Sequence, residues 1–179
     1  MPNYSSNLKK SILIICPFPQ DVAAGQRLKY EQYFNHWKDN GYEITVSSFM
    51  NQSMWNVVYL KGRYLSKIIG TITGYLYRLR DLFRISKYDI IYVHMWVTPF
   101  GSTLPERIVR ALSNKLIYDI EDNTITTVSS NVNSIIAPLK NSNKNKFLMK
   151  MADYVITSSP TLNTHCLNVN NQKKCKYIS

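Results

Sequence analysis

The residues best suited to acid–base chemistry follow two apolar segments that are typical of buried strands. Glu121, Asp122 and Asn123 come directly after one such segment, and His94 ends another. A carboxylate or an imidazole at the end of a strand can orient a substrate hydroxyl or accept its proton. We therefore predict Glu121, Asp122 and His94 as catalytic residues and Asn123 as a substrate-binding residue.

The same residues also have a structural interpretation. An acidic pair at a helix start or on the surface can be neutralised by Arg27 or Lys115. A buried histidine such as His94 more commonly hydrogen-bonds to the backbone than takes part in catalysis. Carboxylates at the active edge of a sheet in a basic protein nevertheless favour the functional interpretation of Glu121 and Asp122.

A second group of candidates, Gly25, Gln26 and Arg27, opens a helical segment after the first strand. A glycine permits close approach of the backbone to a ligand, a helix start presents unpaired N–H groups, and Arg27 adds a cation. We predict that these residues bind phosphate groups of a substrate. The alternative is that Gly25 only begins the helix and that Arg27 is solvated, and the sequence leaves both open.

Both groups of residues are positioned by a repeating order of strand, loop and helix, which begins with residues 11–50. The apolar run 12–16 predicts a strand buried on both faces, which Pro17 ends. A helix is expected from Gly25 to the pair Asn40-Gly41, followed by a strand at 44–49. Such a unit forms a right-handed crossover whose ligand site lies at the carboxyl ends of the strands.

The rest of the chain continues this order. We expect strands at 88–94, 116–120, 152–159 and 174–178, and helices at 103–113, 146–151 and 160–169. Residues 51–55 are polar and irregular, and 123–145, rich in Ser, Asn and Thr, predict a loop that can act as a lid. The predicted fold is a single α/β domain over residues 1–179, Rossmann-like and three-layered, with a mostly parallel sheet covered by helices.

Residues 60–87 form the longest helical segment, and they have two interpretations. Apolar residues recur at spacings of three and four, and every charged residue except Asp81 is basic. We expect Gly70 and Gly74 to divide the segment into two helices. A basic amphipathic segment can lie on an anionic bilayer. The commoner interpretation is a helix that covers the sheet with its apolar face and has a solvated basic face.

Composition limits the classes of partner and location. The formal net charge of +11 indicates an anionic partner, either a membrane surface, a phosphorylated substrate or nucleic acid. No recognised nucleic-acid-binding module occurs, so nucleic acid is disfavoured. The histidines and three cysteines lack metal-ligand spacing, so no metal is expected. The odd cysteine count and a polar N-terminus with only a short apolar run favour a cytoplasmic location.

Several segments, taken in order, resemble glycosyltransferase family 4. The stretch AGQRLKYEQYFNHWKDNGYEITV resembles the opening of that family, in which a Gly-Gly-x-x-Arg loop and a helix precede Gly-His-x-Val-x-Val. Ala24-Gly25 stands at the glycine pair, Arg27 comes one position early, and Tyr42 replaces the usual histidine. The later segments YDIIYVH, YDIEDN and ADYVITSS resemble three further elements of the family, in the same order.

The resemblance implies the N-terminal, acceptor-side domain of a retaining, metal-independent and cofactor-free glycosyltransferase, the first half of a GT-B fold. A nucleotide-sugar donor is then expected on a C-terminal domain that these residues do not include. The acceptor is expected to be a glycan or a lipid-linked glycan in bacterial surface polysaccharide synthesis, at the inner face of the plasma membrane. The alternative hypotheses are a non-catalytic membrane-binding subunit and an inactive remnant of a split glycosyltransferase.

Overall fold

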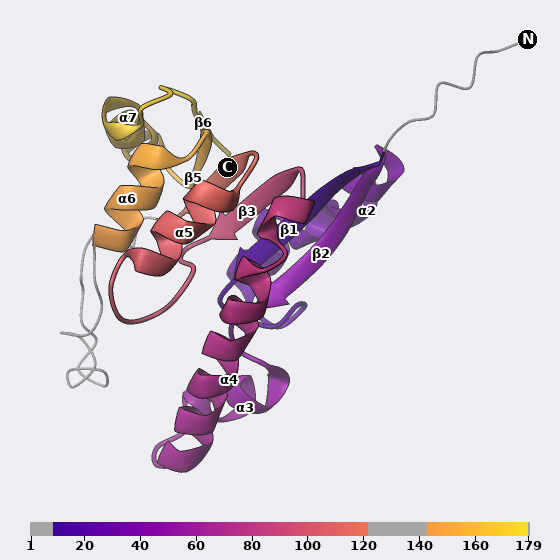
Figure 1. The fold of residues 1–179 in the computed structure, drawn as a ribbon, viewed down its shortest axis with the longest axis vertical. Coiled ribbons are helices and arrows are strands. Elements are labelled where there is room, and N and C mark those ends of the chain that lie inside the picture. Colours follow the sequence, from indigo (N-terminus) through magenta and orange to yellow (C-terminus); the bar gives the residue numbers. More distant parts are fainter. Residues whose placement is uncertain (1–8, 122–142, 179) are drawn as a thin grey trace, which may run out of the picture.

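The computed structural model describes residues 9–121 and 143–178, which contain a six-stranded, wholly parallel sheet flanked by helices (Figure 1). Its strands are β1 (Lys10–Cys16), β2 (Tyr42–Ser48), β3 (Ile90–His94), β4 (Leu116–Ile120), β5 (Tyr154–Thr157) and β6 (Cys175–Tyr177). The order across the sheet is β2-β1-β3-β4-β5-β6, so the direction of progression reverses between β1 and β3. The predicted Rossmann-like, three-layer α/β fold is confirmed.

The helices cover the two faces of the sheet unequally. They are α1 (Ala24–Lys29), α2 (Phe34–Asp39), α3 (Gln52–Val58), α4 (Tyr64–Leu82), α5 (Leu104–Leu112), α6 (Asn143–Met151) and α7 (Pro160–Val169), with 3₁₀ turns η1 (Glu31–Tyr33) and η2 (Ile85–Lys87). Buried residues of α5, α6 and α7 pack in one core cluster, whereas Tyr30 and Phe34, beside α1 and in α2, pack in the other. Right-handed crossovers explain this division, because connections running from β3 to β6 all place their helices on one face.

Strand β1 contributes side chains to both core clusters. Leu13 and Ile15 contact the cluster under α5 to α7, whereas Ile12, Ile14 and Cys16 contact the cluster under α1 and α2. Burial on both faces is what the unbroken apolar run predicts, and each such side chain contributes about 1.5–3 kcal/mol to stability. On the α1 side, Ile117 of β4 and Ile156 of β5 are only partly buried.

The single helix predicted from Gly25 to Asn40 is wrong, because the segment breaks into α1, η1 and α2. The break occurs at Tyr30, whose backbone (φ −134°, ψ −30°) leaves the helical conformation. It turns the Tyr30 ring and the Glu31 carboxylate inward, where they are 1% and 8% exposed. Tertiary packing therefore overrides the helical periodicity of the segment.

The predicted division of the 60–87 segment at Gly70 and Gly74 is also wrong, because α4 runs unbroken through both glycines. A Cβ on Gly70 would lie 2.7 Å from the Met54 side chain, and one on Gly74 would lie 2.6 Å from the Phe49 ring. The glycines therefore allow close packing. Residues 51–55, predicted to be irregular, instead open α3, where the Asn51 side chain accepts a hydrogen bond of 2.8 Å from the backbone N–H of Met54.

Replacing Gly74 by Ala is expected to lower the free energy of unfolding by about 1–3 kcal/mol, because the new methyl group would overlap the ring and the backbone oxygen of Phe49. Gly70→Ala is the matched control and is expected to cost less, because it meets only the side chain of Met54. Urea unfolding measures both variants. Equal losses would contradict the tighter packing at Gly74.

The sequence pattern of α4 most commonly indicates a helix that packs its apolar face on the sheet. In the structure, the helix instead turns a different face toward the protein. Its buried residues are Gly70, Gly74, Arg78 and Asp81, whereas most of its large apolar side chains are exposed. The expectation that the basic residues are all solvated is wrong for Arg78, which is 3% exposed. Together with α3, the first turns of α4 extend beyond the sheet (Figure 1). Within the described residues, no helix has both the length and the apolar character needed to cross a membrane.

Candidate functional site

The carboxyl ends of β3 and β4 meet α1, the helix that follows β1. The strand order reverses between β1 and β3, next to this point, and such a reversal is the usual position of a ligand site in a parallel α/β sheet. The structure brings three of the predicted residues together there. Glu121 Oε1 lies 3.7 Å from Nε2 of His94. A Cβ on Gly25 would lie 3.2 Å from the same oxygen, so the glycine makes room for the carboxylate.

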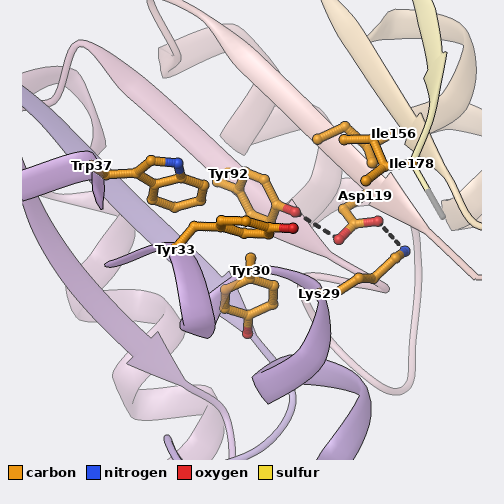
Figure 2. A pocket seen from close by; sticks show the side chains of 8 residues that line it. All are labelled: Lys29, Tyr30, Tyr33, Trp37, Tyr92, Asp119, Ile156 and Ile178. Atoms are coloured by element: carbon orange, nitrogen blue, oxygen red, sulfur yellow. Dashed lines mark hydrogen bonds and ion pairs between the residues drawn. The ribbon is translucent and has the colours of Figure 1, made fainter. Parts of the chain in front are cut away.

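Asp119, which was not among the predicted site residues, lies at the centre of this cluster. It points to the α1 side of β4 and its side chain is fully buried. Its Oδ2 accepts a hydrogen bond of 2.6 Å from the Tyr92 hydroxyl and lies 3.2 Å from Nδ1 of His94. Its Oδ1 forms an ion pair with Lys29 of α1 (Figure 2). We refer to Lys29, His94, Asp119 and Glu121 as the Asp119 cluster.

The protonation state of Asp119 is set by two opposing effects. Burial by itself would raise the pKa of Asp119, because a buried carboxylate loses its hydration. The hydrogen bond and charge of His94, together with the ammonium of Lys29, outweigh burial and lower the pKa of Asp119. Burial and the negative charge of Asp119 raise the pKa of Tyr92, so its hydroxyl stays protonated as a donor. Asp119 is therefore an ionised carboxylate that holds Nδ1 of His94 and leaves Nε2 on the side of Glu121.

Asp119 is expected to make stability depend on pH in the acid range. Its pKa is lower in the folded chain than in the unfolded chain, where an aspartate titrates at about 3.9. Its contribution is therefore fully present above about pH 4 and is lost as the pH falls through the folded-state value. The difference in unfolding free energy between wild type and Asp119→Asn, measured with urea, should shrink as the solution is acidified. A difference that is constant or grows would contradict the assignment.

A cavity of about 280 Å³ lies next to Asp119 on the α1 side of the sheet. It is lined by Lys29, Tyr30, Tyr33, Trp37, Tyr92, Asp119, Ile156 and Ile178. Figure 2 shows Tyr33, Tyr92 and Trp37 at one end, and the ion pair with Ile156 and Ile178 at the other. A second hollow of about 230 Å³ shares Trp37, Tyr92 and Ile156. Aromatic walls beside a few polar groups suit a ligand that has both apolar faces and hydroxyls.

The other two residues predicted at the start of the helix are placed differently. The buried side chain of Gln26 accepts a hydrogen bond from the Phe18 N–H (3.1 Å) and donates to the Phe18 carbonyl (3.1 Å) and to Glu31 (3.2 Å). It thus fastens the loop after β1 to α1. Arg27 is exposed, and it takes no part in the described contacts of the Asp119 cluster. Substrate contact by Gln26 or Arg27 stays a prediction.

Two further predicted residues, Asp122 and Asn123, lie outside the described residues, as does most of the predicted lid at 123–145. The last residues of that range, 143–145, belong to α6, so this helix begins earlier than the predicted Lys146. Among the residues that the structure describes, no group of three or more His, Cys, Asp or Glu side chains is arranged to hold a metal ion.

The sequence pattern indicates that Asp119 is a candidate functional residue, but it does not identify the residues that contact Asp119. Asp119 is the charged residue in an otherwise apolar strand, and a buried charge needs a partner. Lys29 and Tyr92 are far from it in sequence and carry no comparable signal, because only the crossovers of the fold bring them next to β4.

Comparison with models of known protein families finds no match, and no curated protein sequence matches the chain significantly. The resemblance to glycosyltransferase family 4 therefore rests on the sequence segments quoted above and stays a prediction.

Proposed function

We propose that this chain is the acceptor-side domain of a glycosyltransferase similar to family 4. The observation that carries the proposal is the Asp119 cluster, which joins an ionised aspartate, an oriented histidine and a partly exposed glutamate beside a cavity with aromatic walls. The cluster lies at the carboxyl edge of a parallel sheet, where α/β enzymes bind their ligands. The order of the family-like segments in the sequence adds support.

Sugar transfer requires an acceptor hydroxyl to be held against the anomeric carbon of the donor. A bond forms from the hydroxyl oxygen to that carbon, the bond from the carbon to the nucleotide diphosphate breaks, and the hydroxyl proton is released. We assign Glu121 to accept the hydrogen bond and the proton of the hydroxyl, because its side chain is 33% exposed and it follows β4 at the carboxyl edge of the sheet. His94, held by Asp119, positions Glu121, and Asp122 is the second candidate base.

The cavity fits the acceptor better than the donor. Tyr33 and Trp37 offer flat surfaces for the apolar faces of a sugar ring, and the ammonium of Lys29, whose side chain is 15% exposed, can donate a hydrogen bond to a hydroxyl. In this proposal a nucleotide-sugar donor is held by a C-terminal domain. The acceptor is a glycan, free or lipid-linked, of bacterial surface polysaccharide synthesis at the inner face of the plasma membrane. The transfer uses no metal or other cofactor.

Binding of glycans to the purified chain tests this proposal through the fluorescence of Trp37. Bacterial oligosaccharides and extracted lipid-linked glycans are expected to change the tryptophan emission in a saturable way. Trp37→Phe should remove this change, whereas the matched variant Trp55→Phe, at a residue outside the cavity lining, should keep it. Saturable binding of nucleotide sugars in place of glycans, or binding of neither, would overturn the acceptor-side assignment.

A further inference from the structure

Helix α4 presents an apolar face to solvent along its whole length. The residues of this face recur at helical spacing, and each is between 51 and 79% exposed: Leu65, Ile68, Ile69, Ile72, Leu76, Leu79 and Phe83. Tyr59 and Leu60, just before the helix, are also exposed. We refer to these residues as the α4 stripe. Contiguous exposed apolar surface of this kind marks an interaction site.

The opposite face of α4 explains why the stripe points outward. Gly70 and Gly74 pack closely against Met54 and Phe49, so this face lies toward the protein. Arg78 donates hydrogen bonds to three backbone carbonyls: that of Cys16 at the end of β1, that of Ser47 near the end of β2, and that of Val97 in the loop after β3. These contacts fix the rotation of the helix about its axis. The contacts of Gly70, Gly74 and Arg78 with the rest of the protein therefore leave the stripe facing solvent.

The charges around the stripe are of one sign. Between Ile44 and Tyr88 the sequence contains one acidic residue, Asp81, and it is 1% exposed. The exposed charged side chains of this range are all basic: Lys61 and Arg63 before the helix, and Arg80 and Lys87 at its other end. An occupant that covers the stripe therefore meets cations at both ends, and no carboxylate of residues 44–88 is exposed to it.

We propose that α4 docks on the surface of an anionic lipid bilayer. The stripe extends for about 28 Å, the length of a straight 19-residue helix. Its first part lies on the turns of α4 that, together with α3, extend beyond the sheet (Figure 1). A straight apolar face with basic side chains at its ends fits a flat surface that has an apolar interior and phosphate headgroups. The apolar side chains enter the boundary between headgroups and acyl chains, and Lys61 and Arg80 contact phosphates. This proposal rests on α4 and does not depend on sugar transfer.

Sedimentation with vesicles tests the proposal. The purified chain is expected to bind vesicles of phosphatidylglycerol and phosphatidylcholine, and to bind phosphatidylcholine alone much more weakly. The double variant Ile72→Gln, Leu76→Gln should weaken this binding by about tenfold or more. Its matched control is Leu28→Gln, Leu104→Gln, which removes two equally exposed side chains from α1 and α5 and should leave binding unchanged.

The role of charge is tested in the same assay. Lys61→Gln, Arg80→Gln should reduce binding by about fivefold or more and weaken its salt dependence. The control Lys146→Gln, Lys150→Gln makes the same change of net charge on α6, where both side chains are exposed. If the two double variants weaken binding equally, binding depends only on the net charge of the chain, and the proposed docking of α4 is wrong.

A fluorescence measurement places the stripe in the bilayer directly. Tryptophan emission from Leu76→Trp should shift to shorter wavelength on vesicles and be quenched by brominated lipid, whereas emission from Leu28→Trp should not. If the chain instead forms a dimer in sedimentation velocity that is lost in Ile72→Gln, Leu76→Gln and binds no vesicles, the stripe is a contact between copies and the proposal is wrong.

Discussion

Replacing Glu121 by Gln is expected to lower the rate of sugar transfer by about 10²- to 10⁴-fold while leaving the melting temperature near that of the wild type. Glutamine keeps the shape of the side chain but cannot take a proton from an acceptor hydroxyl. The fold should tolerate the change, because the side chain is 33% exposed and is not part of the core. The measurement is transfer of a labelled sugar, with the nucleotide-sugar-binding domain supplied, alongside thermal unfolding.

Two further carboxylate variants are measured in the same assay: Asp122→Asn, next to Glu121, and Glu43→Gln, on β2. Asp122→Asn is expected to have a similar effect if the two carboxylates act together. Glu43→Gln, at an exposed carboxylate of β2, is the matched control and should transfer at the wild-type rate. Full activity of both Glu121→Gln and Asp122→Asn would exclude the acidic pair and make His94 the next residue to replace. Full activity of His94→Gln as well would favour a non-catalytic subunit.

Replacing Arg78 by Met is expected to lower the free energy of unfolding by about 3–5 kcal/mol. The guanidinium donates to the carbonyls of Val97 (2.7 Å), Cys16 (2.8 Å) and Ser47 (3.1 Å), and it pairs with Asp81 at 3.1 Å. All of these contacts are buried. Methionine would remove the donor of the Val97 carbonyl and the positive charge beside the buried Asp81 carboxylate, whereas the Cys16 carbonyl would keep the N–H of Phe49 and Asp81 Oδ2 would keep the Ser47 hydroxyl. Urea unfolding followed by circular dichroism measures the loss.

The matched control for Arg78→Met is Arg80→Met, two residues along the same helix. The Arg80 side chain is 56% exposed and lies 3.5 Å from Asp81, so its loss should cost less than about 1 kcal/mol. Arg78→Lys keeps the charge but lacks the planar fork, and it should fall between wild type and Arg78→Met. If Arg78→Met does not fold, the unfolding free energy of Arg78→Lys is compared with that of Arg80→Met instead. Equal stability of Arg78→Met and Arg80→Met would show that the buried contacts of Arg78 contribute little.

The sequence by itself predicted the sheet, the edge of the sheet that carries the candidate site and some of the residues of that candidate site. Apolar runs such as 12–16 and 116–120 mark buried strands, because both faces of a central parallel strand are covered. The handedness of the crossovers then places the carboxyl ends of β3 and β4 together. His94 and Glu121 follow from this rule, since each stands at the end of such a strand.

Only the tertiary structure decided the break at Tyr30, the Asp119 cluster and the direction of the α4 stripe. Helical periodicity shows which residues share a face of α4, but not which face meets the protein. That choice depends on Gly70 and Gly74 meeting Met54 and Phe49, and on Arg78 finding carbonyl oxygens from three distant segments. Lys29 likewise meets Asp119 across 90 positions of sequence. Contacts of this kind depend on the relative position of whole elements, which a local pattern of residue types does not contain.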